Sequence, residues 1–157
     1  ASEEMLKIAQ KKHSVKEFFQ AKSNDLPFEK ESFQGCLTFH FIMHLDEVVF
    51  TKTIDEVHRI LSKNGTFVFD IPVKNRRKII NQNQENWHAA LSFNQDEIEK
   101  FIKNKFEIRK KFGLLIIPIH RIPKRFRKYF LTFDFLLSNF GLLKNLSSYH
   151  IYELRKI

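Results

Sequence analysis

The sequence predicts an α/β fold, and three segments in the middle of the chain carry that prediction. Residues 33–41 form a mostly apolar run, which is typical of a strand buried on both faces. Residues 46–62 follow with apolar side chains at helical spacing, and residues 66–71 form a second apolar strand. A strand, a helix and a strand in this order form a βαβ unit, in which the two strands run parallel.

The helix predicted over residues 46–62 has a start, a buried face and an end. Asp46 stands in the N-cap position, where a short side-chain oxygen accepts a backbone N–H of the first turn. Four apolar residues recur at helical spacing as one stripe, namely Phe50, Ile54, Val57 and Leu61. Asn64 and Gly65 follow, and both residue types end helices because they tolerate a left-handed backbone. We therefore expect this stripe to pack against the sheet.

The segments on either side continue the alternation of helices and strands. Before the βαβ unit, we expect an amphipathic helix over residues 3–12 and a strand over residues 15–21. Beyond Pro72, we expect a polar helix over 74–82, a linker over 83–92, and a helix from Asn94 with Glu97 as its capping-box partner. The last predicted elements are a strand over 106–119 with a break at Gly113, an aromatic and basic helix over 123–140, and a strand over 148–155.

Positive charge is concentrated in the last third of the 157 residues. The formal net charge is +9, and residues 100–157 hold 14 lysines and arginines against Glu107, Asp134 and Glu153, so this region carries +11. Such a basic region favours an anionic partner. The sequence has no strand with regularly spaced aromatic residues of the kind that binds RNA, which argues against nucleic acid.

The cysteine content and the apolar runs predict a soluble, cytoplasmic protein. Cys36 is the single cysteine, so an internal disulfide and a thiolate metal cluster are both excluded, as is typical of a reducing compartment. Its apolar neighbours predict a thiol packed in the core. The longest apolar run, residues 112–119, is interrupted by Gly113 and Pro118 and is too short to span a bilayer.

Three short motifs surround the predicted βαβ unit. Asp25-Leu26-Pro27-Phe28 precedes the first strand, His44-Leu45 follows it, and Arg59-Ile60-Leu61-Ser62-Lys63-Asn64-Gly65 precedes the second strand. In this order and spacing they resemble the middle of a class I S-adenosylmethionine-dependent methyltransferase, and the resemblance extends over essentially the whole chain. It implies a Rossmann-like methyltransferase sheet in the family order 3-2-1-4-5-7-6, mostly parallel with an antiparallel C-terminal strand.

The resemblance also implies that part of the family sheet is absent. Residues 15–21 correspond to family strand 3, 33–41 to strand 4, 66–71 to strand 5, 106–117 to strand 6 and 148–155 to strand 7. Strands 1 and 2, with the glycine-rich cofactor loop, have no counterpart, since the four glycines lie far apart in the sequence, at Gly35, Gly65, Gly113 and Gly141. We therefore expect residues 1–157 to form a single, incomplete domain with a helical insertion at about 120–141, and Ala1 to be an interior start.

The absent strands would leave a gap between family strands 3 and 4. Residues 15–21 could close directly onto residues 33–41, another chain could fill the gap, or an upstream segment could do so. We favour the upstream segment. An unfilled edge exposes unpaired backbone groups and apolar side chains, so self-association through the sheet edges is expected.

The resemblance places the remaining cofactor site on Lys22, Ser23, Phe39, His40 and His44. Lys22 stands where the family usually has an acid that accepts a hydrogen bond from the adenine amino group, whereas an ammonium can only donate. His44 is the candidate catalytic base toward an acceptor hydroxyl or amine, and bracing a turn is its alternative role. His40 and His44 have the spacing of a zinc site but lack a neighbouring Glu and a third ligand, so no metal site is predicted.

The resemblance implies methyl transfer from S-adenosylmethionine to a small or lipid-like acceptor, with residues 1–157 weak or inactive alone. The alternative is a non-catalytic binding module for a partner chain or an anionic surface.

Residues 120–140 mix basic and aromatic side chains, so they are a candidate contact with an anionic membrane surface, and a solvated helix face is the alternative. Asp70 is expected to cap the turn after its strand, and pointing toward the substrate is its alternative role. Trp87 and His88 are expected to line a substrate wall or to pack on the surface.

Overall fold

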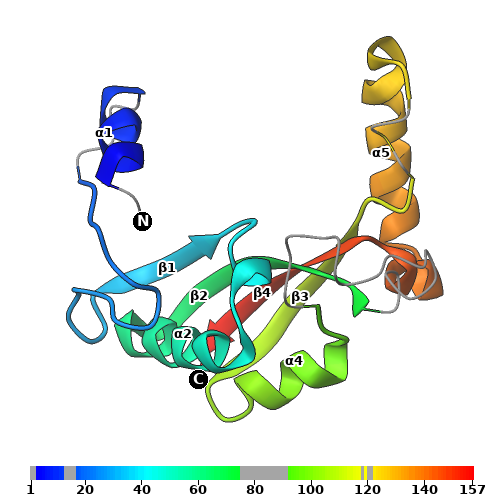
Figure 1. Cartoon of the computed structure of the whole chain (residues 1–157). Helices are drawn as coiled ribbons and strands as arrows, with labels where there is room; N and C mark the ends of the chain where they lie inside the picture. Colours follow the sequence, from blue (N-terminus) through cyan, green and yellow to red (C-terminus); the bar gives the residue numbers. More distant parts are fainter. Residues whose placement is uncertain (1–2, 13–16, 75–91, 118, 120–121) are drawn as a thin grey trace.

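The computed structural model describes residues 3–12, 17–74, 92–117, 119 and 122–157, and it confirms the α/β class (Figure 1). Its main elements in chain order are α1 (Glu3–Lys12), β1 (Phe33–Thr38), α2 (Glu47–Ile60), β2 (Leu61–Pro72), α4 (Gln95–Ile102), β3 (Phe106–Leu114), α5 (Arg127–Ser138) and β4 (Tyr149–Lys156). Short 3-10 helices are η1 (Ile42–His44), η4 (Lys124–Phe126) and η5 (Gly141–Leu146). None of the described helices is long and apolar enough to cross a membrane.

Among the described residues, four strands form one sheet in the order β1-β2-β4-β3. β1 and β2 run parallel, with Leu37 opposite Val68. β4 runs antiparallel to both of its neighbours, with Tyr152 opposite Phe69 on β2 and Lys111 on β3. This arrangement matches the predicted order of family strands 4, 5, 7 and 6, including the antiparallel last strand.

The hydrophobic core lies between one face of the sheet and the helices α2 and α4 (Figure 1). Phe69 and Tyr152 from the two central strands are fully buried, and their rings stack with centroids 5.4 Å apart. Phe50 from α2 packs against Phe93 and Phe101, with ring centroids 5.4 and 5.2 Å away. Because full burial of an aromatic side chain contributes about 1.5–3 kcal/mol, this layer is the main apolar contribution to stability.

β1 is less buried than its apolar sequence predicts. Leu37 is 65% exposed and Phe33 is 37% exposed, so the expectation of burial on both faces is wrong. The reason is that β1 is the edge strand and that α2 and α4 cover one face of the sheet (Figure 1). Successive side chains of a strand point to opposite faces, so Leu37 points away from the face on which its neighbour Cys36 packs. Cys36 packs against the core on the covered side, and burial raises the pKa of its thiol, which confirms the predicted packing role.

The predicted start of α2 is confirmed, but its end comes earlier than expected. An oxygen of the Asp46 side chain accepts the backbone N–H of Val49 at 2.7 Å. The helix ends at Ile60 because Leu61 takes an extended conformation and is fully buried as the first residue of β2. The capping box of α4 is also confirmed, since Glu97 Oε2 accepts the backbone N–H of Asn94 at 2.8 Å.

The N-terminal region contains the clearest wrong prediction. The helix over residues 3–12 is present as α1, with Met5 and Ile8 exposed on its surface. No strand forms over the described part of residues 15–21, namely residues 17–21, because a strand requires a hydrogen-bonded neighbour and this segment lies outside the sheet. It therefore does not close onto β1. The predictions for residues 75–91, including Trp87 and His88, lie outside the described residues.

Gly113 does not break β3 as predicted, because it pairs with His150 inside the strand. β3 ends after Leu114, where Leu115 has a left-handed φ of 62°. A Cβ atom at Gly113 would lie 2.3 Å from the carbonyl oxygen of Ser138 and 2.2 Å from Oγ of Ser147. The absence of a side chain at Gly113 therefore allows the end of α5 to pack directly on β3.

We predict that Gly113→Ala destabilises the fold by about 1–3 kcal/mol, because the added methyl group overlaps a backbone oxygen that cannot rotate away. Urea denaturation followed by circular dichroism measures the change. Gly35→Ala is the matched control, since the nearest atom to its new Cβ would be Thr66 O at 3.9 Å. Equal stability of the two variants would show that α5 does not pack tightly on β3.

We predict that His150 makes stability fall as the pH decreases from 6.5 toward 4. Its side chain is buried, and burial lowers the pKa to about 4. Across this window the unfolded chain binds a proton that the folded chain does not, so up to about 1.4 kcal/mol is lost per pH unit. Urea denaturation of the wild type and His150→Gln at several pH values measures the difference. Parallel pH profiles for the two proteins would contradict the assignment.

Candidate functional site

The carboxyl ends of β1 and β2 lie side by side, and the candidate site is the loop that begins there. Thr38, the last residue of β1, is opposite Phe69, and the chain then leaves the sheet through residues 39–45. In open α/β sheets, ligands bind outside the carboxyl ends of the strands. The structure places three of the predicted site residues in this loop, namely Phe39, His40 and His44.

Asp70 holds the first part of the loop in place. Its Oδ1 atom accepts the backbone N–H of His40 at 2.7 Å, and its Oδ2 atom lies 3.7 Å from Nδ1 of the same residue. His40 has a left-handed φ of 51°, which is uncommon for a residue with a side chain. The Asp70 carboxylate, which is buried, stabilises this conformation. Asp70 therefore braces the turn after β1 rather than the turn after its own strand.

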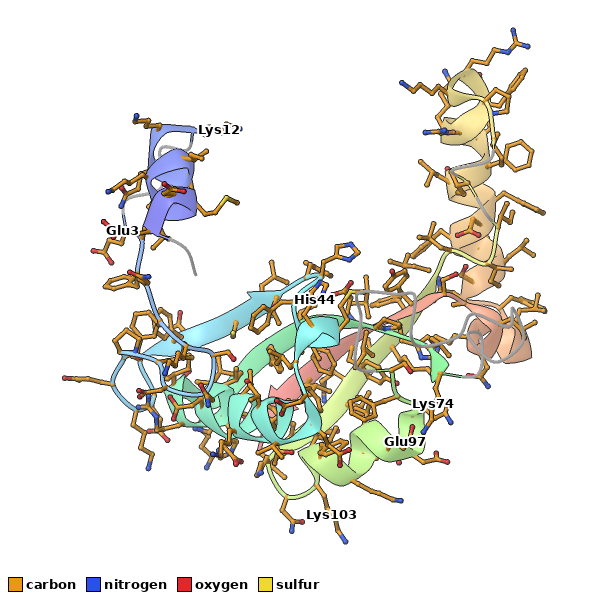
Figure 2. The ribbon with its side chains drawn as sticks, viewed as in Figure 1. Glu3, Lys12, His44, Lys74, Glu97 and Lys103 are labelled. Carbon is orange, nitrogen blue, oxygen red and sulfur yellow. The ribbon has the colours of Figure 1, made fainter. Side chains whose placement is uncertain are left out.

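The second part of the loop is anchored by apolar side chains. Ile42 and Met43, within η1, are 0% and 6% exposed, so they fix the loop to the body of the domain. Phe39 and Phe41 are 47% and 39% exposed, and His44 is also exposed. Figure 2 shows His44 on the short helical turn at the end of β1. The loop thus has buried anchors and presents aromatic and imidazole groups to solvent.

His40 also contacts the central strand β4. Its ring lies edge-on to the Tyr149 ring, with centroids 5.7 Å apart. Tyr149 is opposite Pro72 in the sheet, so the loop after β1, the end of β2 and the start of β4 meet at this edge. No group of three or more His, Cys, Asp or Glu side chains that could hold a metal ion is found in the described part of the chain.

Lys22 and Ser23, the other predicted site residues, lie in the loop before β1, and Ser23 is bonded to α2. Lys22 forms an isolated β-bridge with Asp25, and Ser23 Oγ accepts a hydrogen bond from Thr53 Oγ1 at 2.9 Å. Thr53 belongs to α2 and is buried. Among the described residues, the hydrogen bond of Ser23 is therefore with α2 rather than with the His40 loop.

Glu56 and Arg59 on α2 fix the loop that carries Lys22 and Ser23. Glu56 Oε2 accepts the backbone N–H of Leu26 at 3.0 Å, and the Arg59 guanidinium donates to the carbonyl oxygens of Phe28 and Leu26 at 2.8 and 3.1 Å. The hydrogen bond from Arg59 lowers the pKa of Glu56. Sequence reasoning missed this pair, although the spacing of three residues on a helix is a signal for such a contact.

Comparison with known proteins identifies a family match at the N-terminal end of the chain. Residues 1–69 match a family described as a methyltransferase domain. No curated protein sequence matches this one.

Several solved structures have a similar fold. The S-adenosylmethionine-dependent methyltransferase of Thermotoga maritima, described as a possible histamine N-methyltransferase, has a TM-score of 0.70 at 18% identity, with 99% of this chain and 70% of that chain covered. A Methanosarcina mazei S-adenosylmethionine-dependent methyltransferase has a TM-score of 0.66 at 13% identity, covering 99% and 79%. Geranyl diphosphate C-methyltransferase of Streptomyces coelicolor, solved with Mg²⁺, geranyl diphosphate and S-adenosyl-L-homocysteine, has a TM-score of 0.54 at 14% identity, covering 86% and 50%.

We predict that Asp70→Ala destabilises the protein by about 1–3 kcal/mol, because the backbone N–H of His40 loses its acceptor. Urea denaturation gives the total cost, and the amide signal of His40 in a nitrogen–proton NMR spectrum reports on the loop itself. Asp70→Asn keeps a carbonyl oxygen that can accept the same hydrogen bond, so it serves as the control. If Asp70→Asn and Asp70→Ala lower the free energy of unfolding by the same amount, the hydrogen bond does not stabilise the loop.

Proposed function

We propose a methyl-transfer function for this chain, which has the class I S-adenosylmethionine-dependent methyltransferase fold and whose residues 1–69 match the methyltransferase-domain family. The proposed cofactor is S-adenosylmethionine, and the proposed acceptor is a small or lipid-like molecule. The observation that carries the proposal is the family match over the same residues that build the loop at the carboxyl ends of β1 and β2. The Streptomyces protein, solved with an isoprenoid diphosphate and S-adenosyl-L-homocysteine, supports both the cofactor and a lipid-like acceptor.

The described loop supplies part of what such a reaction needs. Methyl transfer from a sulfonium is a displacement in which orientation and exclusion of water supply most of the catalysis. Phe39 and Phe41 offer exposed apolar surface to a bound ligand, and the Asp70 hydrogen bond keeps the loop in one conformation. His44, in its neutral form, is our candidate to accept a proton from an acceptor hydroxyl or amine.

The described residues do not supply the rest of a cofactor site. The glycines at 65 and 113 serve close packing within the domain, since a Cβ atom there would approach Ser62 O to 2.8 Å and Ser138 O to 2.3 Å. Gly35 and Gly141 lie far from each other in the sequence, so no glycine-rich turn is formed. The side chain of Lys22 offers no acceptor to an adenine amino group. We therefore propose that residues 1–157 are an incomplete domain that binds the cofactor weakly.

The second candidate is a non-catalytic binding module for a partner chain or an anionic surface. Lys22 favours this candidate, because its ammonium group can only donate hydrogen bonds and stands where the family usually has an acid that accepts one from the cofactor. The edge of β1 also favours it. Among the described residues no strand pairs with the outer side of β1, so its backbone groups can accept a further strand from another chain or a second copy, beside the exposed Leu37. For either candidate we propose a cytoplasmic location, consistent with the packed, unpaired thiol of Cys36.

We predict that S-adenosylhomocysteine gives no saturable heat when titrated into folded residues 1–157 in a calorimeter. The same titration is then made with the longest chain that the gene encodes. One-to-one binding by a longer chain with a glycine-rich turn and an acid upstream would support the methyltransferase proposal.

Two other results would change the proposal. Saturable one-to-one binding by residues 1–157 themselves would show that the described loop completes a cofactor site, and the incomplete-domain proposal would be wrong. A longest chain that starts near Ala1 and gives no heat while remaining folded would favour the binding module. Circular dichroism before each titration separates loss of binding from loss of folding.

A further inference from the structure

In its C-terminal half, α5 turns polar residues toward the protein. Asp134 is 3% exposed, and its two carboxylate oxygens accept the backbone N–H groups of Leu115 and Ile117 at 2.9 and 2.6 Å. Ser138, one turn later, is fully buried. The Asn139 side chain accepts from the backbone N–H of Gly113 at 3.0 Å and donates to its carbonyl oxygen at 3.3 Å. These contacts attach the C-terminal half of the helix to Gly113 in β3 and to the chain that follows β3.

The opposite side of α5 is apolar and exposed. What we call the outer stripe consists of Tyr129, Phe133 and Leu136, at helical spacings of four and three, together with Phe140, two residues after the end of the helix. They are 65%, 53%, 64% and 74% exposed. A helix on the surface of a soluble domain normally has the reverse orientation, with apolar residues inside. The helix projects away from the sheet (Figure 1).

The N-terminal end of α5 is strongly basic. Lys124, Arg125, Arg127 and Lys128 lie in η4 and the first turn of the helix, which contains no acidic residue. Cations at the positive end of the helix dipole are locally unfavourable, so a nearby anion would stabilise this arrangement. The only carboxylate within residues 122–140 is Asp134, which is buried. The exposed surface of α5 therefore has cations and apolar groups with no negative charge of its own.

Cations and aromatic rings are also paired along this surface. The Arg125 guanidinium lies 4.7 Å from the centroid of the Phe126 ring, and Lys128 Nζ lies 4.9 Å from that of Tyr129. A bilayer surface that contains anionic phospholipids matches both properties, because it offers phosphates beside an apolar layer. A second copy of this helix would bring another cationic and apolar surface, with no anion to match.

We propose that α5 is a membrane-docking helix for the surface of a bilayer that contains anionic phospholipids. The outer stripe enters the boundary between headgroups and acyl chains, and the basic end contacts headgroup phosphates. The Asp134 and Asn139 hydrogen bonds hold the stripe outward while the protein is in solution. This inference goes beyond the proposed methyl-transfer function and does not depend on it, since it requires neither cofactor binding nor methyl transfer. It names the kind of anionic surface that the second candidate function leaves open.

The test is co-sedimentation with vesicles of phosphatidylcholine alone and of phosphatidylcholine with phosphatidylserine. We expect binding to the anionic vesicles, weak binding to the neutral ones, and loss of binding as salt rises, because salt screens the basic end. The double variant Phe133→Gln and Leu136→Gln should bind at least about tenfold more weakly. Val48→Gln is the control, since Val48 on α2 is 65% exposed, like Leu136, but lies outside the stripe.

Charge is tested separately with a matched pair of triple variants. Lys124→Gln, Arg125→Gln and Lys128→Gln remove three cations from the basic end, whereas Lys52→Gln, Lys63→Gln and Lys103→Gln remove three exposed cations elsewhere. Only the first set should weaken binding. Equal effects of the two sets, no binding by the wild type, or binding unaffected by the stripe variant would each overturn the proposal. A concentration-dependent dimer in analytical ultracentrifugation that the stripe variant abolishes would assign the stripe to a second copy instead.

Discussion

Burial of one face of the sheet against α2 and α4 is the constraint on which the rest of the structure depends. Phe67 and Phe69 from β2 and Tyr152 and Leu154 from β4 are all fully buried on this face. A shift of one residue in either strand would move these side chains to the opposite face, so their burial fixes the register. The register in turn brings Asp70 beside the end of β1. The candidate site is thus positioned by the core beneath it.

Local signals in the sequence were sufficient for the elements that have their own caps and buried stripes. Asp46 and the stripe beginning at Phe50 predicted α2, and Asn94 with Glu97 predicted α4, because capping and helical spacing act within a few residues. The strand expected over residues 15–21 failed because a strand depends on a neighbour that the local sequence does not reveal. For the same reason the exposure of Leu37 could not be predicted: whether a strand is covered is a property of the whole sheet.

The candidate site was predictable as a loop but not as a set of contacts. The resemblance located Phe39, His40 and His44, and these residues share one loop in the structure. The brace from Asp70 to His40 joins residues 30 positions apart, and the Arg59 contacts reach back to Phe28 and Leu26. Such contacts appear only once the strands are in register. The burial of the polar side of α5 could not be predicted for the same reason, because Asp134 accepts its hydrogen bonds from residues in the chain after β3.

The position of β4 has a consequence for the order of events during protein synthesis. β4 lies between β2 and β3, although the ribosome makes it after both of them. Until β4 emerges, β3 has no described partner in the sheet, and the buried face of β2 lacks the rings that stack on it. A nascent chain therefore exposes apolar strand surface while β3, α5 and η5 are being made, which is the condition under which chaperones bind. α5, which projects away from the sheet (Figure 1), is translated during this interval, before the sheet that supports it is complete.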